Sequence, residues 1–372
     1  MINQERIVKE FMEMVQVASP TKKEGQFAQL LKHKLEAMGL EVYVDNAGKE
    51  AGSDTGNVIG RLKGNKPGLP AVIFAAHMDT VSPGEGIRPV IKEGIIYSRG
   101  DTVLGSDDKA GIAAILEALR HLKEEGISHG DIEVVFTIAE EGGLFGSKYL
   151  DYSLLKGKIA FVLDSGGAPG TIINRAPAQD KLSFVIHGKA AHAGVSPQEG
   201  ISAIQAAARA IDRMKLLRID EETTANIGVI KGGSVTNIVC DRVEIEAEAR
   251  SLSVEKLEKQ SRHMVECMEE ACREFGARLE SNVERAYNPF FVEEQDPLVL
   301  AARKAAEKLG LESRVISTGG GSDTNNFNAR GIKAVNLGVG MSKVHTLDEF
   351  IPIKDLVDSA RYVVSIIEEL GK

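Results

Sequence analysis

Apolar residues follow two spacings along the chain, and each spacing predicts one kind of element. Predominantly apolar runs at 71–76, 132–138 and 159–163 are typical of strands buried on both faces of a parallel sheet. Thr21 and Glu24 have the spacing of a capping box at the start of a helix. Apolar residues at helical spacing predict helices over residues 3–16, 27–38, 112–122, 298–309 and 353–370. Strands alternating with helices predict an α/β fold with a mixed, mainly parallel sheet.

The pattern changes between residues 178 and 288. There the predicted order is strand, helix, two strands, helix and strand, which is the split-βαβ or ferredoxin-like arrangement. The six elements are expected at 181–188, 201–217, 225–230, 243–250, 254–275 and 278–287. We therefore expect a compact domain of residues 178–288 inserted into a discontinuous domain of residues 1–177 and 289–372.

Composition narrows the class of protein. The 372 residues are 43% hydrophobic and 27% charged, which is ordinary for a globular protein. The net charge of −9 argues against nucleic acid as a partner, because phosphate binding needs a basic surface. No apolar run is long enough to span a membrane, and the polar N-terminus shows no signal-peptide pattern. The three cysteines form no paired motif and are expected to be reduced, which is consistent with a cytoplasmic protein.

The predicted strands end in residues that can bind metals or move protons. His77 follows the first apolar run, with Asp79 two positions later, and Asp164 follows the third run. The second run leads into two adjacent glutamates, Glu140 and Glu141. Because ligands of open α/β sheets gather at the carboxyl ends of the strands, these side chains are expected to converge.

Two further candidates lie outside these strands. Asp107 opens a helix between two of the strands, and His345 stands on a late loop. A structural interpretation exists for each kind of residue, because a histidine can end a strand without binding anything and the helix dipole stabilises an acid in a first turn. Imidazole and carboxylate donors without a cysteine suit zinc, with cobalt or manganese possible. Without Asp79, these are two imidazoles and four carboxylates, and six positions exceed the needs of one catalytic zinc and fit two ions that share a carboxylate.

The ordered set of these residues resembles the motifs of the M20 metallopeptidases. The segment from Leu104 to Gly111, which contains Asp107, looks most like the peptidase T branch of that family. The resemblance implies a zinc-exopeptidase-like catalytic domain and an inserted domain that serves as lid and dimerisation domain. It also implies two zinc ions, a homodimer and a small peptide as the substrate.

The resemblance further implies how the metal ligands are shared. His77 and Asp164 would bind one zinc, Glu141 and His345 would bind the other, and Asp107 would bridge the two.

Two more residues complete the implied catalytic set. Asp79 would orient the imidazole of His77, and Glu140 would be the general base. The family commonly has a strained or cis peptide bond after the bridging aspartate, so such a bond is expected between Asp107 and Asp108.

Outside the metal site, the resemblance points to residues that would contact the substrate. His192 would steady the oxyanion in a neighbouring active site across the dimer. Asn237 and Arg250 would contact the peptide, and an arginine suits bidentate capture of a carboxylate. Gly320 belongs to a glycine run that lines the substrate cleft in the family, although such a run can also bind phosphate. The structural alternatives are ordinary loop residues and, for Arg250, an exposed strand charge.

We therefore predict a metal-dependent aminopeptidase that hydrolyses small peptides, tripeptides or dipeptides, by attack of a metal-bridging water with a glutamate base. Two departures from peptidase T leave the substrate class open. Ala193 follows His192 where that branch usually has proline, and residues 142–146 differ from its usual run. The alternatives are an M20-type N-acyl amino acid deacylase or amidohydrolase and, from another class, a non-catalytic peptide-binding protein.

Overall fold

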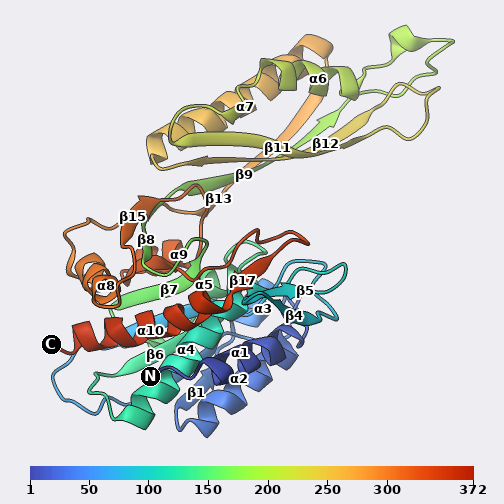
Figure 1. The fold of residues 1–372 in the computed structure, drawn as a ribbon. Helices are drawn as coiled ribbons and strands as arrows, with labels where there is room; N and C mark the ends of the chain where they lie inside the picture. The colour runs from blue at the N-terminus through green and yellow to red at the C-terminus, as the bar shows by residue number, and fades with distance from the viewer. The chain divides into compact units, whose positions relative to one another are not determined.

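The computed structural model describes residues 1–372, and the chain divides into two compact units (Figure 1). The first unit contains Met1–Arg175, Phe291–Ser317 and Ser322–Lys372. The second contains Ala176–Phe290 together with Thr318–Gly321. The insertion predicted at residues 178–288 lies within the second unit, whereas residues 318–321, which the sequence places in the first domain, belong to the second unit.

The first unit is an α/β structure. Its helices are α1 (Gln4–Val15), α2 (Gly25–Ala37), α3 (Ala47–Ala51), α4 (Ser106–Glu125), α5 (Phe145–Tyr149), α8 (Pro297–Lys308), α9 (Asp323–Ala329) and α10 (Ile353–Leu370). The strands are β1 (Glu41–Val44), β2 (Val58–Leu62), β3 (Val72–His77), β4 (Pro89–Lys92), β5 (Ile95–Ser98), β6 (Ile132–Thr137), β7 (Ile159–Ser165), β8 (Thr171–Ala176), β14 (Phe290–Phe291), β15 (Arg314–Ser317), β16 (Lys333–Gly338) and β17 (Phe350–Pro352).

The main sheet runs in the order β1-β2-β6-β3-β7-β16-β8-β14, and β15 pairs with β8. The four central strands, β6, β3, β7 and β16, are parallel to one another. The pairs β1–β2, β2–β6 and β16–β8 are antiparallel. The prediction of a mixed sheet with a parallel centre is confirmed, and the carboxyl ends of β6, β3 and β7 meet at one edge.

The central strands are buried on both faces, as their predominantly apolar sequences predict. Every residue of β3 and β6 is buried. Ile73 and Ala75 of β3 pack in one core cluster with Phe327 of α9. Because successive side chains alternate between the faces of a strand, Phe74 points the other way, and its ring stacks on that of Phe161 at 5.7 Å. A strand covered on both sides holds its last residues firmly, which matters for the histidine that ends β3.

The second unit has the predicted split-βαβ order. Its elements are β9 (Ala178–His187), α6 (Ala203–Arg213), β10 (Leu217–Arg218), β11 (Thr223–Gly232), β12 (Arg242–Ser251), α7 (Val254–Phe275) and β13 (Arg278–Tyr287). The strands form an antiparallel sheet in the order β10-β11-β12-β9-β13. Helices α6 and α7 cover one face of it, and their apolar side chains share a core with β9, β11 and β12 (Figure 1).

Helix α6 is shorter than the sequence pattern indicates. The hydroxyl of Ser202 accepts a hydrogen bond from the backbone N–H of Gln205 and caps the helix at its start. The backbone turns to an extended conformation at Met214, and Leu217 then begins the short strand β10. The apolar periodicity continues past the end of the helix because residues of the following segment also face the core.

All three cysteines carry free thiols. None of the helices combines the length and the apolar composition needed to cross a membrane.

Candidate metal centre

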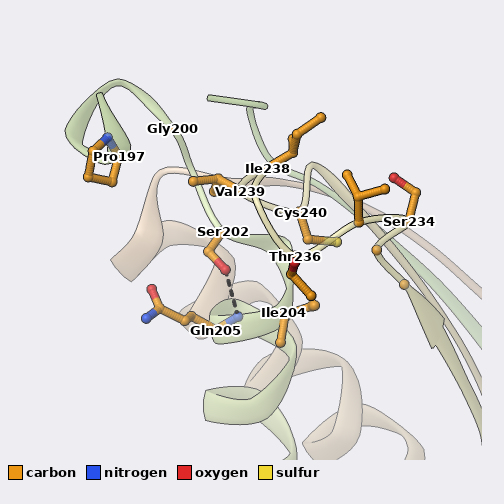
Figure 2. Close-up of a pocket in the computed structure, with 13 residues that line it drawn as sticks. Pro197, Gly200, Ser202, Ile204, Gln205, Ser234, Thr236, Ile238, Val239 and Cys240 are labelled. Atoms are coloured by element: carbon orange, nitrogen blue, oxygen red, sulfur yellow. Dashed lines mark hydrogen bonds between the residues drawn. The ribbon is translucent and has the colours of Figure 1, made fainter. Parts of the chain in front are cut away.

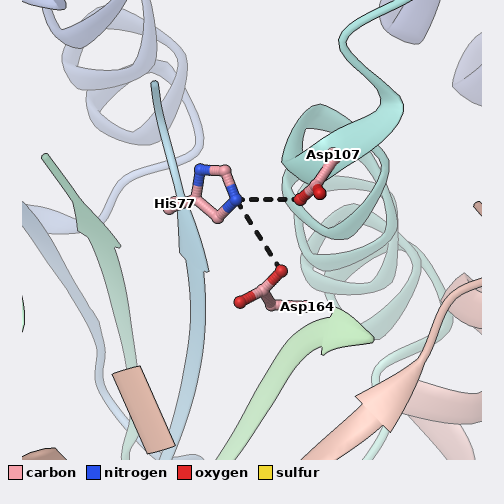
Figure 3. Close-up of side chains that lie close together, drawn as sticks. All are labelled: His77, Asp107 and Asp164. Carbon is pink, nitrogen blue, oxygen red and sulfur yellow. Dashed lines mark hydrogen bonds and ion pairs between the residues drawn. The ribbon is translucent and has the colours of Figure 1, made fainter. Parts of the chain in front are cut away.

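His77 ends β3 at the carboxyl edge of the sheet, and two carboxylates face the same nitrogen of its ring (Figure 3). Its Nε2 atom lies 2.9 Å from Oδ1 of Asp107 and 3.7 Å from Oδ1 of Asp164. The three residues come from the end of β3, the start of α4 and the end of β7. Their donor atoms lie within 4.8 Å of one another, so the three could hold a metal ion.

A second group of donors uses the other oxygen of Asp107. Nε2 of His345 lies 3.3 Å from Oδ2 of Asp107 and 2.7 Å from Oε1 of Glu141. The Asp107 carboxylate therefore faces His77 with one oxygen and His345 with the other. Asp107, Glu141 and His345 form a set that could hold a metal ion, and His77, Glu140 and Glu141 form another.

Asp79 connects three of these residues. Its Oδ1 accepts a hydrogen bond from the backbone N–H of Glu140 at 2.9 Å, and its Oδ2 accepts one from that of Glu141 at 3.2 Å. Nδ1 of His77 lies 2.9 Å from the backbone oxygen of Asp79 and 3.4 Å from its Oδ1. The main chain of Asp79 is thus nearer to the imidazole than its carboxylate, and the carboxylate holds the two glutamates.

Two residues of the segment before α2 hydrogen-bond to residues of the site, although their spacing in the sequence predicts a helix cap. The predicted capping box is wrong, because Glu24 stands at the N-cap of α2 without a side-chain cap bond. Instead Thr21 Oγ1 donates to Oδ2 of Asp79 at 2.8 Å. Glu24 is fully buried and accepts hydrogen bonds from the N–H of Ala139 at 2.9 Å and from the hydroxyl of Ser53 at 2.6 Å. Both residues therefore hold parts of the site.

The peptide bond between Asp107 and Asp108 is cis, as the resemblance led us to expect. Asp108 is buried, and its Oδ2 accepts a hydrogen bond from the N–H of His77 at 3.1 Å. Its Oδ1 accepts one from the N–H of Gly111 at 3.3 Å, which is the capping contact that an acid in a first helical turn predicts. Asp108 thus joins the start of α4 to the end of β3.

Negative charge accumulates at this edge of the sheet. Burial raises the pKa of Glu140 well above its usual value, and the neighbouring carboxylate of Asp164 raises it further. Burial likewise raises the pKa of Asp164, and repulsion from Asp107 adds to this. The carboxylates of Asp107 and Glu141 raise the pKa of His345 to about 10, because each accepts a hydrogen bond from the charged imidazole. The site therefore stabilises positive charge strongly.

The donor set fits divalent cations. It consists of imidazole nitrogens and carboxylate oxygens without a thiolate, which suits zinc and the harder first-row metals. A buried cluster of carboxylates is costly unless a cation compensates it. Two of the donor groups share Asp107 through different oxygens, and this is the arrangement that a carboxylate bridging two ions requires.

Two buried charged residues at the site carried no signal in the sequence. Asp323 begins α9 and accepts hydrogen bonds of 2.5 Å from the hydroxyls of Thr137 and Ser147. Lys109 is fully buried, and its ammonium group donates to the backbone oxygen of Val17 at 2.7 Å. Their partners are 186, 176 and 92 positions away, so only the folded chain reveals these contacts.

His192 and Asn237 lie in the second unit, where they stand on paired segments. The backbone N–H of Ala193 donates to the oxygen of Asn237 at 2.9 Å, and His192 forms an isolated antiparallel bridge with Ile238. The loop that carries Asn237 also borders a pocket of about 700 Å³. Figure 2 shows the residues that line it, which come from this loop, from the segment around Gly200 and from the start of α6.

Arg250 lies in the same unit but at the other end of β12. The strand from Arg242 to Arg250 extends over about 26 Å at the usual rise per residue. The structure therefore does not bring Arg250 near His192 and Asn237 within this unit. The guanidinium group of Arg250 donates two hydrogen bonds of 3.0 Å to the carboxylate of Glu248, which is the bidentate geometry that suits a carboxylate.

Packing leaves more space for a side chain at Gly320 than at Gly321. The N–H of Gly320 donates to the hydroxyl of Thr318 at 3.2 Å, and a Cβ atom at position 320 would meet nothing closer than 3.8 Å. A Cβ atom at Gly321 would lie 2.2 Å from the ring of Tyr287. Packing in the glycine run thus requires glycine at position 321 and not at position 320.

Metal donors gathered at the carboxyl edge of a mixed sheet, with a shared carboxylate, define the class of α/β metallohydrolases with paired metal sites. The chain belongs to peptidase family M20/M25/M40, whose model matches residues 73–369. The predicted family is therefore confirmed.

Close relatives span the whole chain. The protein YqjE of Bacillus subtilis strain 168 is 48% identical over 372 residues, which are 100% of both chains. The structure of aminopeptidase PepT from Bacillus cereus is 48% identical, covers 100% of both chains and has a TM-score of 0.91. A tripeptidase structure from Staphylococcus aureus is 43% identical, covers 100% of this chain and 99% of the other, and has a TM-score of 0.96.

Proposed function

We propose that this protein is a dinuclear zinc aminopeptidase that hydrolyses tripeptides or dipeptides in the cytoplasm. The observation that carries the proposal is the sharing of Asp107 between two donor groups, one with His77 and Asp164 and one with Glu141 and His345. Full-length similarity to an aminopeptidase and a tripeptidase supports the substrate class. Cobalt or manganese could replace zinc, because the donor types suit them too.

The five ligands would divide the two ions between them. His77 and Asp164 would hold one, Glu141 and His345 would hold the other, and Asp107 would contact both. A bound pair of divalent ions polarises a carbonyl group and lowers the pKa of water.

Glu140 is the residue best placed to move the proton. It is only 8% exposed, and burial raises its pKa, so its carboxylate is a stronger base than that of an ordinary glutamate. Its carboxyl group would take the proton from water and pass it to the nitrogen of the leaving amine. Asp79 accepts hydrogen bonds from the backbone N–H groups of Glu140 and of the neighbouring Glu141, which would help the two side chains to keep different tasks.

Residues of the second unit would bind the substrate. Arg250 would accept the C-terminal carboxylate of the peptide in place of Glu248, which now occupies its guanidinium group. His192 would stabilise the developing charge on the carbonyl oxygen, and Asn237, on the segment paired with it, would hold the peptide. Gly320 would let the peptide backbone approach closely.

We further propose a homodimer whose contact lies in the second unit. Several apolar side chains on the paired segments that carry His192 and Asn237 are exposed, namely Val195 at 75%, Val235 at 54% and Ile238 at 45%. Exposed apolar surface of this kind is typical of an interface. Sedimentation of the purified protein at several concentrations tests the dimer, and a monomer at micromolar concentration would contradict it.

The function itself is tested by metal analysis and a substrate panel. The protein should contain two zinc ions per chain, lose activity on treatment with a chelator and regain it with zinc, cobalt or manganese. Tripeptides and dipeptides with a free amino terminus should be cleaved, whereas N-acetylated peptides should not. Cleavage of N-acyl amino acids in preference to peptides would instead identify a deacylase.

A further inference from the structure

Glu349 is a buried carboxylate that has no role in the hydrolysis proposed above. It is 2% exposed and lies on the same loop as His345, four positions further along the chain. Its two oxygens accept four hydrogen bonds of 2.6–3.1 Å. The donors are the backbone N–H groups of Leu104, Gly105 and Asp107 and the hydroxyl of Ser106.

These donors need a partner that the local chain does not supply. Residues 104–107 are buried, and buried N–H groups are costly without a hydrogen bond. Asp107 and Asp108 have non-helical backbone angles, so the regular turns of α4 cannot satisfy the segment that precedes them. Gly105, at the N-cap of α4, has no side chain to help. Glu349, which lies 242 to 245 positions further along the chain, accepts hydrogen bonds from three of these N–H groups.

The loop that carries Glu349 is itself fixed at its base. The backbone groups of Ser342 and Phe350 exchange two hydrogen bonds, of 3.0 and 3.1 Å, which close the loop around His345. Phe350 belongs to β17, which pairs with β5, and its ring lies 5.6 Å from that of Tyr97. The backbone of Glu349 is therefore held by a small sheet while its side chain holds the segment that ends in Asp107.

We propose that Glu349 is a positioning residue that sets Asp107 and His345 relative to each other. It joins the two segments that carry them, so that the imidazole of His345 lies 3.3 Å from Asp107 and 2.7 Å from Glu141. The inference rests on the proposed function, because it takes these residues as metal ligands. The group of Asp107, Glu141 and His345 takes one ligand from each of the two segments that Glu349 joins. The group of His77, Asp107 and Asp164 takes only Asp107 from them. Loss of Glu349 should therefore weaken one ion more than the other.

The decisive variant is Glu349→Gln, which keeps the size of the side chain but turns an NH2 group toward N–H or O–H donors. Metal-free protein would be titrated with zinc in competition with a chromogenic chelator. The variant should bind one zinc within threefold of the wild-type affinity and the other at least tenfold more weakly. Two wild-type affinities, or an equal loss at both sites, would overturn the proposal.

Amide hydrogen exchange of the metal-free protein gives a second readout that needs no metal. In Glu349→Gln the amides of residues 104–107 should exchange at least tenfold faster than in the wild type, with α7 of the second unit unchanged. Unchanged exchange at 104–107 would overturn the proposal even if the wild type binds two ions. A wild type that shows neither two zinc sites nor peptide hydrolysis would refute the proposed function instead.

Two further variants control the test. Asp348→Asn alters the exposed carboxylate next to Glu349, which pairs only with Lys343 at 3.6 Å, and should leave both zinc affinities unchanged. Ser106→Ala removes one of the four donors and should weaken the same zinc site two- to threefold. If Glu349→Gln does not fold, Ser106→Ala decides the matter, and unchanged zinc binding in it would overturn the proposal.

Discussion

The hydroxyl of Thr21 donates a hydrogen bond of 2.8 Å to the carboxylate of Asp79. The bond links the segment before α2 to the residue that holds Glu140 and Glu141 by their backbone N–H groups. A segment that supplies none of the candidate metal ligands therefore stabilises the site.

Thr21→Val should therefore lower activity without removing the metals. The valine has the shape of threonine but cannot donate, and a hydrogen bond to a charged group contributes about 1.5–3 kcal/mol. We expect kcat to fall about tenfold, because Asp79 would hold the two glutamates less firmly. Thr21→Ser keeps the hydroxyl and should retain most of the activity. Equal kcat values for the two variants would show that the bond does not matter.

Glu140→Gln separates proton transfer from metal binding. The variant should keep two metal ions per chain, measured by elemental analysis after gel filtration, while kcat falls by about 100- to 10,000-fold. Glu141→Gln should instead lose an ion, because Glu141 lies 2.7 Å from His345 in one of the donor groups. Loss of metal from Glu140→Gln and its retention in Glu141→Gln would show that the two tasks are assigned the wrong way round.

Arg250→Lys should weaken binding of peptides with a free C-terminal carboxylate. A lysine cannot make the two parallel hydrogen bonds that Arg250 makes to Glu248, so we expect KM to rise about tenfold or more with little change in kcat. For peptides with an amidated C-terminus, variant and wild type should have similar KM values. Arg242→Lys, at the other end of β12, is the matched control and should behave as the wild type. A rise in KM that is as large for amidated peptides would exclude carboxylate recognition.

The stability of the first unit should depend on Glu10. This carboxylate is 5% exposed and accepts hydrogen bonds from Arg120 at 2.5 and 2.6 Å and from Lys34 at 2.8 Å. Glu10→Gln removes the anionic partner of Lys34 and the nearer of the two partners of Arg120, whose other carboxylate is that of Glu117 at 3.9 Å. We expect it to destabilise the metal-free protein by about 2 kcal/mol. Urea unfolding measures this. Glu13→Gln, an exposed carboxylate on the same helix, should change the free energy of unfolding by less than about 0.5 kcal/mol.

The same residue predicts a pH dependence. Burial alone would raise the pKa of Glu10, but hydrogen bonds from Arg120 and Lys34 outweigh burial and leave the pKa below its ordinary value of 4.5. A lowered pKa in the folded state means that the unfolded chain binds more protons as the solution is acidified. The stabilisation is therefore complete above pH 4.5 and is lost as the pH falls through the folded pKa. Below pH 4.5 the difference in unfolding free energy between wild type and Glu10→Gln should shrink, and a constant difference would contradict this.

The strands and the donors at their ends could be predicted because their signals are local. A strand covered on both faces is predominantly apolar, so three short runs locate β3, β6 and β7 within about two residues. The direction of a parallel strand then brings His77 and Asp164 to the same edge. The order of elements in the second unit follows from the same local patterns, since α7 and β13 begin and end where the apolar periodicity does.

The residues that support the donors could not be predicted, because their partners are distant in the sequence. Thr21 and Glu24 have the spacing of a capping box, and nothing local distinguishes that motif from hydrogen bonds to Asp79 and Ala139. The helix ending at Arg213 was overestimated for a related reason, because side chains beyond a helix can continue its apolar pattern while the backbone turns away. The apolar periodicity of a sequence indicates which side chains are buried. It does not determine whether the backbone that carries them is helical.

The placement of the donors along the chain has a consequence for synthesis on the ribosome. All three donors of the group of His77, Asp107 and Asp164 belong to the first 164 residues. The group that contains Glu141 lacks a donor until His345 has been made, and Glu349 follows four residues later. A nascent chain, or one truncated before residue 345, would therefore carry the three donors of the first group but not His345. Under the proposed function, both ions could bind only after the chain has been synthesised beyond residue 345.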